Sequence, residues 1–422
     1  MHSVTDWKFA KRPNYITNVD KAYPYSDVPY LEGYSLGKLP TSPNDLVEHV
    51  DYWGEGRISG SSGFTHCYNV NHQYQLVSNG PDRGRKIPNR IPVEGYNNCD
   101  TSNYIKDNSV STVTVMGAPI NHSCARDIAR IVNHAGGKVV VFGFDSNSQD
   151  IQNLTSELMN KSLFLCPSYT LTDDLLGLTL FQSHIAFLNL TVLKDELYRN
   201  VTNGNFEAAI ELIKILDNED GGEAIFETIK KLISSNSINT MTFAYKLWSS
   251  GSKSIVNKYF PVSFKLICNE DNVTIVNMEY KQALKLDSNT DDYNDRFAWG
   301  DSTDKTSKRV SWKIIPVADG DNVTFKLYNI DCGMYLKLDV TVDSIGDRQA
   351  WGSKNNDELR HRYYLKPFIT NEKLVYHIIN CQYDQVLKLD VNEDSTGDRL
   401  LWGHNGNAQQ KYNRFKWIIA AW

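Results

Sequence analysis

The stretch Leu284-Lys285-Leu286-Asp287 occurs twice more in the chain, as Leu336-Lys337-Leu338-Asp339 and as Leu387-Lys388-Leu389-Asp390. A second block with the pattern Asp-Arg-x-x-Trp-Gly follows each copy, beginning at Asp295, Asp347 and Asp398. Both blocks recur at the same offsets, 52 residues and then 51 residues. Because two patterns repeat in one order at one spacing, we interpret this part of the chain as three copies of one structural unit.

Each unit has the pattern of a set of short strands. It opens with apolar residues at every second position, which is the period of a half-buried β-strand, and it closes on an aromatic strand. The opening residues are Val273 and Ile275, Val323 and Phe325, and Val375 and His377; the closing residues are Trp312, Tyr364 and Trp417. One unit cannot bury its own apolar face, so three units close around a pseudo-threefold axis and remove the exposed edges. The sequence predicts an all-β β-trefoil over residues 260–422.

The repeated blocks also predict where individual side chains lie. We expect the two leucines of each Leu-Lys-Leu-Asp block in the core. The tryptophans Trp299, Trp351 and Trp402 should cover the barrel or its cap. Each is followed by a glycine, and we expect Gly300, Gly352 and Gly403 in turns that require an unusual φ.

The Asp-Arg…Trp-Gly corners have two interpretations. Flat aromatic rings beside carboxylates suit sugars, so the corners are candidate glycan sites, with Asp347, Arg348, Trp351, Asp398, Arg399 and Trp402 as candidate ligand-binding residues. Alternatively, the Asp-Arg pairs brace the turns and the tryptophans pack. We favour bracing, because a constraint of the fold acts on all three units, whereas function usually singles one out. No catalytic residue is predicted here.

The segment before the repeats has helical periodicity. Apolar residues recur every three or four positions in 191–259, and Asn205, the glycines at 221–222 and the Ser-Ser-Gly-Ser run at 249–252 separate the stripes. The helices are expected around Leu193–Val201, Phe206–Leu216, Ile225–Ile233, Met241–Trp248 and Lys253–Tyr259. Stripes of this kind form the core of a helical bundle, so the sequence predicts a central all-α domain over residues 191–259.

Several motifs resemble one family over residues 192–422. They are Asp-Glu-Leu-Tyr-Arg-Asn at 195–200, Asn-Phe-Glu-Ala-Ala at 205–209, Phe-Ala-Tyr-Lys-Leu-Trp at 243–248, Gly-Ser-Lys at 251–253, Asp-Lys-Thr-Ser at 304–307, Val-Ser-Trp-Lys at 310–313, and Trp402-Gly403. In these motifs the chain is similar to the moth low-molecular-weight, thirty-kilodalton haemolymph lipoproteins of the microvitellogenin family. The resemblance implies a helical domain followed by a β-trefoil.

The same resemblance carries expectations about function. It implies an extracellular storage protein of haemolymph and egg, associated with lipid and with sugar binding, and without enzymatic activity. Members normally begin with a signal peptide followed by the helical domain, whereas about 190 unrelated residues stand there in this chain. Its first residues contain no apolar h-region, so we expect no signal peptide.

The first 190 residues predict an α/β domain. Strands are expected at 112–116 and 138–143, helices at 125–132 and 149–159, and the last strands of the domain within 161–191. The apolar run at 138–143 is typical of a strand buried on both faces in a parallel sheet. This order is a fragment of a doubly wound sheet. Residues 1–110 are rich in tyrosine, which favours short strands and loops over disorder.

The run from Ala125 to Gly143 weakly resembles the later half of a class I methyltransferase fold. An enzyme of that kind would place a pocket near Gly117 and Gly143. The only glycine-rich candidate for its donor loop is 54–60, and we find no strong strand ahead of it, so no cofactor-binding residue is assigned. The alternative function is therefore a methyltransferase-like enzyme whose trefoil targets glycans, and a third hypothesis is a glycan-binding module that recognises microbial surfaces.

The remaining signals are weaker. His66, Cys67, His72 and Cys99 fit no standard metal spacing, so no metal is expected, and no cofactor is assigned. We interpret the basic residues as part of a solvated loop, and the alternative is that they contact a phosphate group. They are Arg83, Arg85, Lys86 and Arg90.

Charge and composition narrow the class of protein. A net charge of −6 argues against a general nucleic-acid binder, and no apolar run is long enough to cross a membrane. Seven dispersed cysteines indicate neither a zinc site nor a disulfide-dense scaffold. The partners that the sequence allows are lipid and glycans; it does not predict the oligomeric state.

Overall fold

The computed structural model describes most of the chain in two compact units. The described residues are 47–54, 67–72, 76, 83–84, 87, 90–116, 119–142, 144–145, 147–167, 184–217, 221–302, 306–405 and 411–422. The first unit extends to Asn200 and includes Glu207–Ala224; the second consists of Val201–Phe206 and Ile225–Trp422. Each unit is described by itself.

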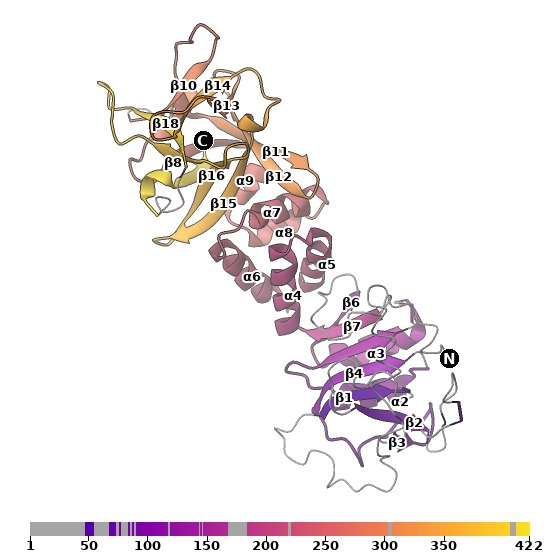
Figure 1. Ribbon diagram of the computed structural model, residues 1–422. Helices are drawn as coiled ribbons and strands as arrows, with labels where there is room; N and C mark the ends of the chain where they lie inside the picture. Colours follow the sequence, from indigo (N-terminus) through magenta and orange to yellow (C-terminus); the bar gives the residue numbers. More distant parts are fainter. Residues whose placement is uncertain are drawn as a thin grey trace. The chain divides into compact units, whose positions relative to one another are not determined.

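The first unit is built on a seven-stranded sheet (Figure 1). Its strands are β1 (Val47–Tyr52), β2 (Cys67–His72), β3 (Arg90–Val93), β4 (Val110–Met116), β5 (Lys138–Phe142), β6 (Leu163–Pro167) and β7 (His184–Asn189). Their order in the sheet is β3-β2-β1-β4-β5-β7-β6. The first five strands are parallel, and β7 is antiparallel to both β5 and β6. The sheet is thus wound in two directions from β1, with a switch point between β1 and β4.

Two helices of this unit begin at side-chain caps. Asn121 accepts a hydrogen bond from the amide of Cys124 at the start of α2 (His122–Ile131), and Ser148 accepts one from Ile151 at the start of α3 (Gln149–Met159). The two helices pack against each other. The predicted strands at 112–116 and 138–143 and both predicted helices are confirmed, with small differences at their ends.

The three valines of β5, Val139, Val140 and Val141, are fully buried, which agrees with the predicted burial on both faces, but β5 pairs parallel with β4 and antiparallel with β7. The sequence shows no strong strand ahead of Gly54, yet β1 ends at Tyr52. This strand carries Glu48, His49 and Asp51, so its sequence lacks an apolar run. His49 and Asp51 are nevertheless buried, and both form hydrogen bonds with Thr114 of β4.

Six helices follow the sheet. They are α4 (Leu190–Thr202), α5 (Phe206–Leu216), α6 (Gly222–Ser234), α7 (Asn239–Ser249), α8 (Lys253–Tyr259) and α9 (Val262–Cys268). The first five match the predicted helices. Helix α9 was not predicted: it follows Pro261 and buries Phe264 and Ile267. In the second unit α7 packs against α8 and α9, and α7 and α9 contact strands of the β domain.

The second unit holds a twelve-stranded antiparallel sheet. Its strands are β8 (Asn272–Asn277), β9 (Ala283–Leu286), β10 (Arg296–Asp301), β11 (Trp312–Asp319), β12 (Asn322–Asn329), β13 (Met334–Leu338), β14 (Arg348–Ser353), β15 (Tyr363–Thr370), β16 (Lys373–Asn380), β17 (Val386–Leu389), β18 (Arg399–His404) and β19 (Trp417–Ala421), with short 3₁₀ turns at Lys308–Val310, Leu359–His361 and Asn413–Phe415. Strands β8, β11, β12, β15, β16 and β19 pair in a closed ring. The prediction of a closed β domain is confirmed.

The remaining six strands form three hairpins, β9–β10, β13–β14 and β17–β18, and the second strand of each hairpin pairs with the second strands of the other two. We call these three hairpins the hairpin cap. In Figure 1 its labelled strands, β10, β13, β14 and β18, lie at the end of this unit away from α7. The leucines of all three Leu-Lys-Leu-Asp blocks are fully buried, as predicted.

Two details of the repeat differ from the prediction. The closing aromatic residue of the second unit is Tyr363, not Tyr364, because Tyr363 is fully buried and pairs with Asn380, as Trp312 pairs with Asn329 and Trp417 with Asn277. The glycines after the tryptophans lie inside strands β10, β14 and β18, and none has a positive φ.

What requires these three glycines is close packing between units. A Cβ built on Gly352 would lie 2.3 Å from Leu286 Cδ1, one on Gly300 2.6 Å from Leu389 Cδ1, and one on Gly403 2.4 Å from Leu338 Cδ1. Each glycine therefore makes room for a leucine of another unit.

Candidate functional site

The hairpin cap is held together by three buried lysines. The lysine of each Leu-Lys-Leu-Asp block forms an ion pair with the aspartate of the Asp-Arg block one unit earlier around the axis: Lys337 with Asp295, Lys388 with Asp347, and Lys285 with Asp398 at 2.5 Å. Lys285 also reaches Asp301 at 3.1 Å, and His404 Nδ1 lies 2.5 Å from Asp347 Oδ1. The pairs form a cycle that connects all three units.

The arginines of the Asp-Arg blocks brace the turns of their own hairpins. Nη1 of Arg296 donates to the carbonyl oxygens of Asp287 and Ser288, and Arg348 and Arg399 repeat this contact one and two units later. The guanidinium of Arg348 also lies 3.8 Å from the ring centroid of Tyr383, and that of Arg399 lies 4.0 Å from that of Tyr280.

Six half-buried side chains cover the point where β10, β14 and β18 pair with one another. Three are the tryptophans of the Asp-Arg-x-x-Trp-Gly blocks, and three are the residues that directly follow the arginines of these blocks. They are Trp299, Trp351 and Trp402, and Phe297, Gln349 and Leu400. Trp351 stacks on Phe297 with ring centroids 3.8 Å apart. The indole nitrogens of Trp351 and Trp402 are buried and have no hydrogen-bond partner among the described residues.

The structure gives each predicted site residue a defined place. Asp347 and Asp398 are buried in ion pairs, Arg348 and Arg399 donate to backbone carbonyls, and the tryptophans lie in the half-buried layer. Every one of these contacts recurs in the other units, so the bracing interpretation has a physical basis. The glycan interpretation stays a prediction. The sequence analysis assigned no role to the lysines of the cycle. Lys285, Lys337 and Lys388 are nevertheless part of the repeated Leu-Lys-Leu-Asp block.

Residues 191–421, more than half of the chain, match the family model described as lepidopteran low molecular weight (30 kD) lipoprotein. The chain belongs to this family.

Relatives of this lipoprotein include microvitellogenin of Manduca sexta, 39% identical over 227 residues, which are 54% of this chain and 91% of that protein. Low molecular mass lipoprotein PBMHP-6 of Bombyx mori is 38% identical over 54% of this chain and 88% of that protein. Among solved structures, the Rhizoctonia solani agglutinin aligns at 14% identity over 36% of this chain and 95% of its own, with a TM-score of 0.27. That value is too low to support an argument about fold or ligand.

Most of the α/β unit of this lipoprotein lies outside the matched region. At the carboxyl ends of β1, β2 and β3, the rings of Trp53, His72 and Tyr96 form a cluster, with centroids 4.3 to 5.4 Å apart. Trp53 has φ 65°, and a Cβ on Gly54 would overlap the carboxylate of Asp51. The tight turn after β1 thus requires a glycine directly beside the switch point. The pocket expected near Gly117 and Gly143 lies outside the described residues.

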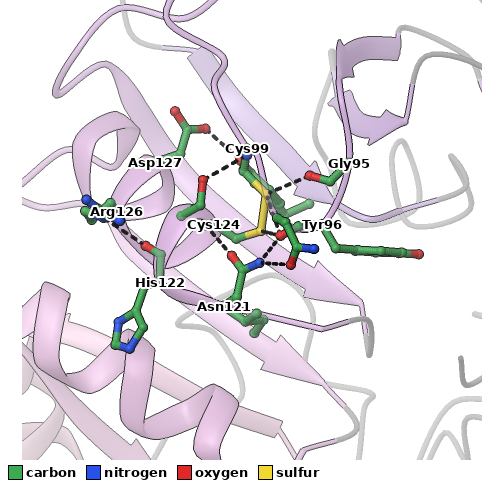
Figure 2. Close-up of a disulfide and its surroundings, with 12 residues drawn as sticks. Gly95, Tyr96, Cys99, Asn121, His122, Cys124, Arg126 and Asp127 are labelled. Carbon is green, nitrogen blue, oxygen red and sulfur yellow. Dashed lines mark hydrogen bonds between the residues drawn. A yellow bond between two sulfur atoms is a disulfide. The ribbon is translucent and has the colours of Figure 1, made fainter.

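A disulfide joins Cys99 to Cys124 in the same unit (Figure 2). It ties the segment after β3 to the first turn of α2, where Asn121 donates to the carbonyl of Tyr96 (Figure 2). The disulfide removes Cys99 from the weak set of metal candidates, in which His66 lies outside the described residues. Within the described part of the chain, no cluster of His, Cys, Asp or Glu is suited to hold a metal ion.

A second network lies beneath the disulfide. The buried carboxylate of Asp127 accepts hydrogen bonds from the Tyr52 hydroxyl at 2.6 Å and the Thr101 hydroxyl at 2.7 Å, and pairs with Arg130 at 2.9 Å. Burial and the Asp127 carboxylate raise the pKa of Tyr52 well above its ordinary value. Because Asp127 is enclosed by donors, the network is suited to hold α2 on the sheet.

Other candidate groups are also buried. Arg90 of the predicted basic loop lies buried in β3 and donates to the carbonyl of His72, while Arg85 and Lys86 lie outside the described residues. Burial raises the pKa of the Cys166 thiol, and it raises that of Cys268 to about 12, which disfavours the reactive thiolate at both sites. In the described segments, no helix is long and apolar enough to cross a membrane.

Proposed function

We propose that this chain is a non-enzymatic storage or carrier lipoprotein of haemolymph and egg, and is therefore extracellular. The observation that carries the proposal is membership of the lepidopteran lipoprotein family, together with the match to a relative named microvitellogenin. The cap geometry supports a non-catalytic role, because its most regular charged residues are engaged in ion pairs and backbone hydrogen bonds. No nucleic-acid role is part of the proposal.

The proposal includes a domain organisation. We assign residues 260–422 to a β-trefoil, residues 191–259 to a helical domain and residues 1–190 to an α/β domain. The trefoil assignment is supported by the six-stranded ring and by the three hairpins whose second strands meet on one axis.

Glycan binding is a finer part of the proposal. It would use Asp347, Arg348, Trp351 and their equivalents Asp398, Arg399 and Trp402. One feature supports it: the tryptophans are only half-buried, so part of each indole ring is exposed for a sugar ring to stack on.

The direct test measures the lipid carried by the protein. The full chain is produced in insect cells, purified without detergent and extracted, and the phospholipid and neutral lipid are quantified by mass spectrometry. We expect lipid in proportion to protein, and we expect the protein in haemolymph and egg extracts probed by immunoblot. Protein that is free of lipid and absent from both extracts would contradict the proposal.

A second candidate function is favoured by one observation, the doubly wound sheet of the first unit. Open α/β sheets bind nucleotide-like ligands in the crevice at a switch point, and Gly54 lies at that point between β1 and β4. The candidate is a methyltransferase-like enzyme fused to the lipoprotein. Calorimetric titration of the full chain with S-adenosylmethionine tests it: micromolar binding supports an enzyme in the first unit, and the absence of heat at saturating ligand argues against it.

A further inference from the structure

One turn of the hairpin cap exposes aliphatic side chains. The β13–β14 turn, residues 339–347, carries Val340, Val342 and Ile345, which are 60%, 51% and 69% exposed. We call these three residues the apolar tip. Exposed aliphatic residues are unremarkable when single, but a group of three on one short turn requires an explanation.

The backbone of this turn is fixed by hydrogen bonds. Oδ1 of Asp343 accepts from the amides of Ile345 at 3.0 Å and Asp347 at 2.8 Å, and Arg348 Nη1 donates to the carbonyls of Asp339 and Val340. The apolar tip is therefore presented by a braced loop.

The equivalent turns of the other units have the same bonds with different side chains. Asp291 accepts from the amides of Tyr293 and Asp295, and Asp394 accepts from those of Thr396 and Asp398. The positions of the apolar tip are occupied by Ser288, Thr290 and Tyr293 in the first turn and by Val391, Glu393 and Thr396 in the third. Since the first turn forms with no aliphatic residue at these positions and the third with only Val391, the turn geometry does not require the three aliphatic residues of the second copy.

The size and charge of the apolar tip indicate what it contacts. Three such side chains expose on the order of 300 Å², well below the ~800 Å² per partner of a stable protein interface. No residue of 339–347 is basic, so the turn has no attraction for an anionic surface. Shallow insertion into an uncharged lipid surface fits both facts. We propose that the apolar tip is the contact of this chain with a zwitterionic phospholipid surface, an inference that rests on the proposed carrier function.

The test measures partitioning of the full chain onto phosphatidylcholine vesicles by flotation. The variant Val340→Ser/Val342→Thr/Ile345→Thr takes residue types that stand at these positions in the equivalent turns, so the turn should fold unchanged, which circular dichroism and thermal melting check. We expect its partition coefficient to fall at least about tenfold, because it loses most of the apolar area available for burial. The matched control, Val391→Ser in the third turn, should stay within about twofold, because Val391 is a single exposed residue outside the apolar tip.

Each other outcome has a distinct meaning. If the wild type and the triple variant partition equally, the inference about the apolar tip is overturned and the carrier function is unaffected. The same holds if the wild-type protein carries extractable lipid but does not bind vesicles. A many-fold gain when phosphatidylserine is added overturns the choice of a zwitterionic surface. Loss of a wild-type oligomer in the triple variant, seen by sedimentation, would show that a second copy covers the tip. If the wild-type protein neither carries lipid nor binds vesicles, the proposed carrier function itself is contradicted.

Discussion

Asp347 contacts two side chains of the next unit, Lys388 and His404. It is 2% exposed, so its removal leaves a buried lysine without a counter-charge. We expect Asp347→Ala to lower the free energy of unfolding by about 3–5 kcal/mol in denaturant titration. The double variant Asp347→Leu/Lys388→Met removes both charges and should cost clearly less. Equal losses in the single and double variants would show that the charge pairing does not matter.

His49 gives the first unit a pH dependence. Burial lowers the pKa of His49 from 6.5 to about 3. Its partner determines which ring nitrogen carries the proton in the neutral form: Thr114 gives its hydroxyl proton to Asp51, so it accepts from Nε2–H of His49. Because the folded-state pKa lies below the unfolded value, the unfolded state takes up the proton first. The stability is fully present above pH 6.5 and falls as the pH drops toward 3.

The slope from this one group is about 1 kcal/mol per pH unit within that window. We expect His49→Gln, which keeps a side-chain N–H, to flatten the decline in unfolding free energy between pH 6.5 and 3 relative to wild type. The measurement is denaturant unfolding at several pH values. If the unfolding free energies of the two proteins decline in parallel with falling pH, His49 is not the source of the pH dependence.

At the scale of the elements, the close packing of the strands in the hairpin cap requires glycine, a residue without a Cβ, after each tryptophan. A Cβ on Gly352 of β14 would lie 2.3 Å from Leu286 Cδ1, which is itself fully buried. We expect Gly352→Ala to cost about 1–3 kcal/mol through overpacking, measured by thermal or denaturant unfolding. Gly136→Ala, where nothing lies within 4 Å and φ is not positive, serves as control and should be nearly neutral. A harmless Gly352→Ala would mean that Leu286 moves aside freely.

The sequence predicted most of the elements because their patterns are periodic. The three repeats, helices α4–α8 and the run from β4 to α3 were all found in this way. Strand β1 was missed because its polar residues are buried by specific hydrogen bonds, which no hydropathy pattern reveals. The register error at Tyr363 and Tyr364 arose because two adjacent tyrosines satisfy the same pattern, and only pairing with Asn380 separates them.

The candidate site was predicted less completely than the fold. The repeat identified Asp347, Arg348 and Trp351 as a set, but the ion-pair partners of Asp347 and the stacking partner of Trp351 lie in other units, and a sequence does not state which copy pairs with which. The lysines were assigned to an alternating strand without a role. The three aliphatic residues of the apolar tip break the repeat rather than follow it, so they become visible only when exposure is known.

For the whole molecule, the disulfide distinguishes the two units. Cys99 and Cys124 lie 25 residues apart within the first unit, and among the described residues Cys166, Cys268, Cys332 and Cys381 are not part of a disulfide. Closing a loop of this length contributes about 3 kcal/mol. We expect reduction, or Cys99→Ser/Cys124→Ser, to lower the melting temperature of one calorimetric transition by roughly 6–12 °C and to leave the other unchanged. A shift of both transitions, or of neither, would contradict this.

The cycle of Lys–Asp pairs has a consequence for how such a domain can arise. Every unit carries both halves of the pairing, and every pair joins two different units. A short ancestral chain with one unit would therefore satisfy its charges as a trimer of identical copies. Gene duplication and fusion would then only tether partners that already fitted, and no new contact would have to be invented. Each descendant copy could afterwards diverge at its turn, as the second did with its valines and isoleucine, while the charges inherited from the trimer held the ring closed.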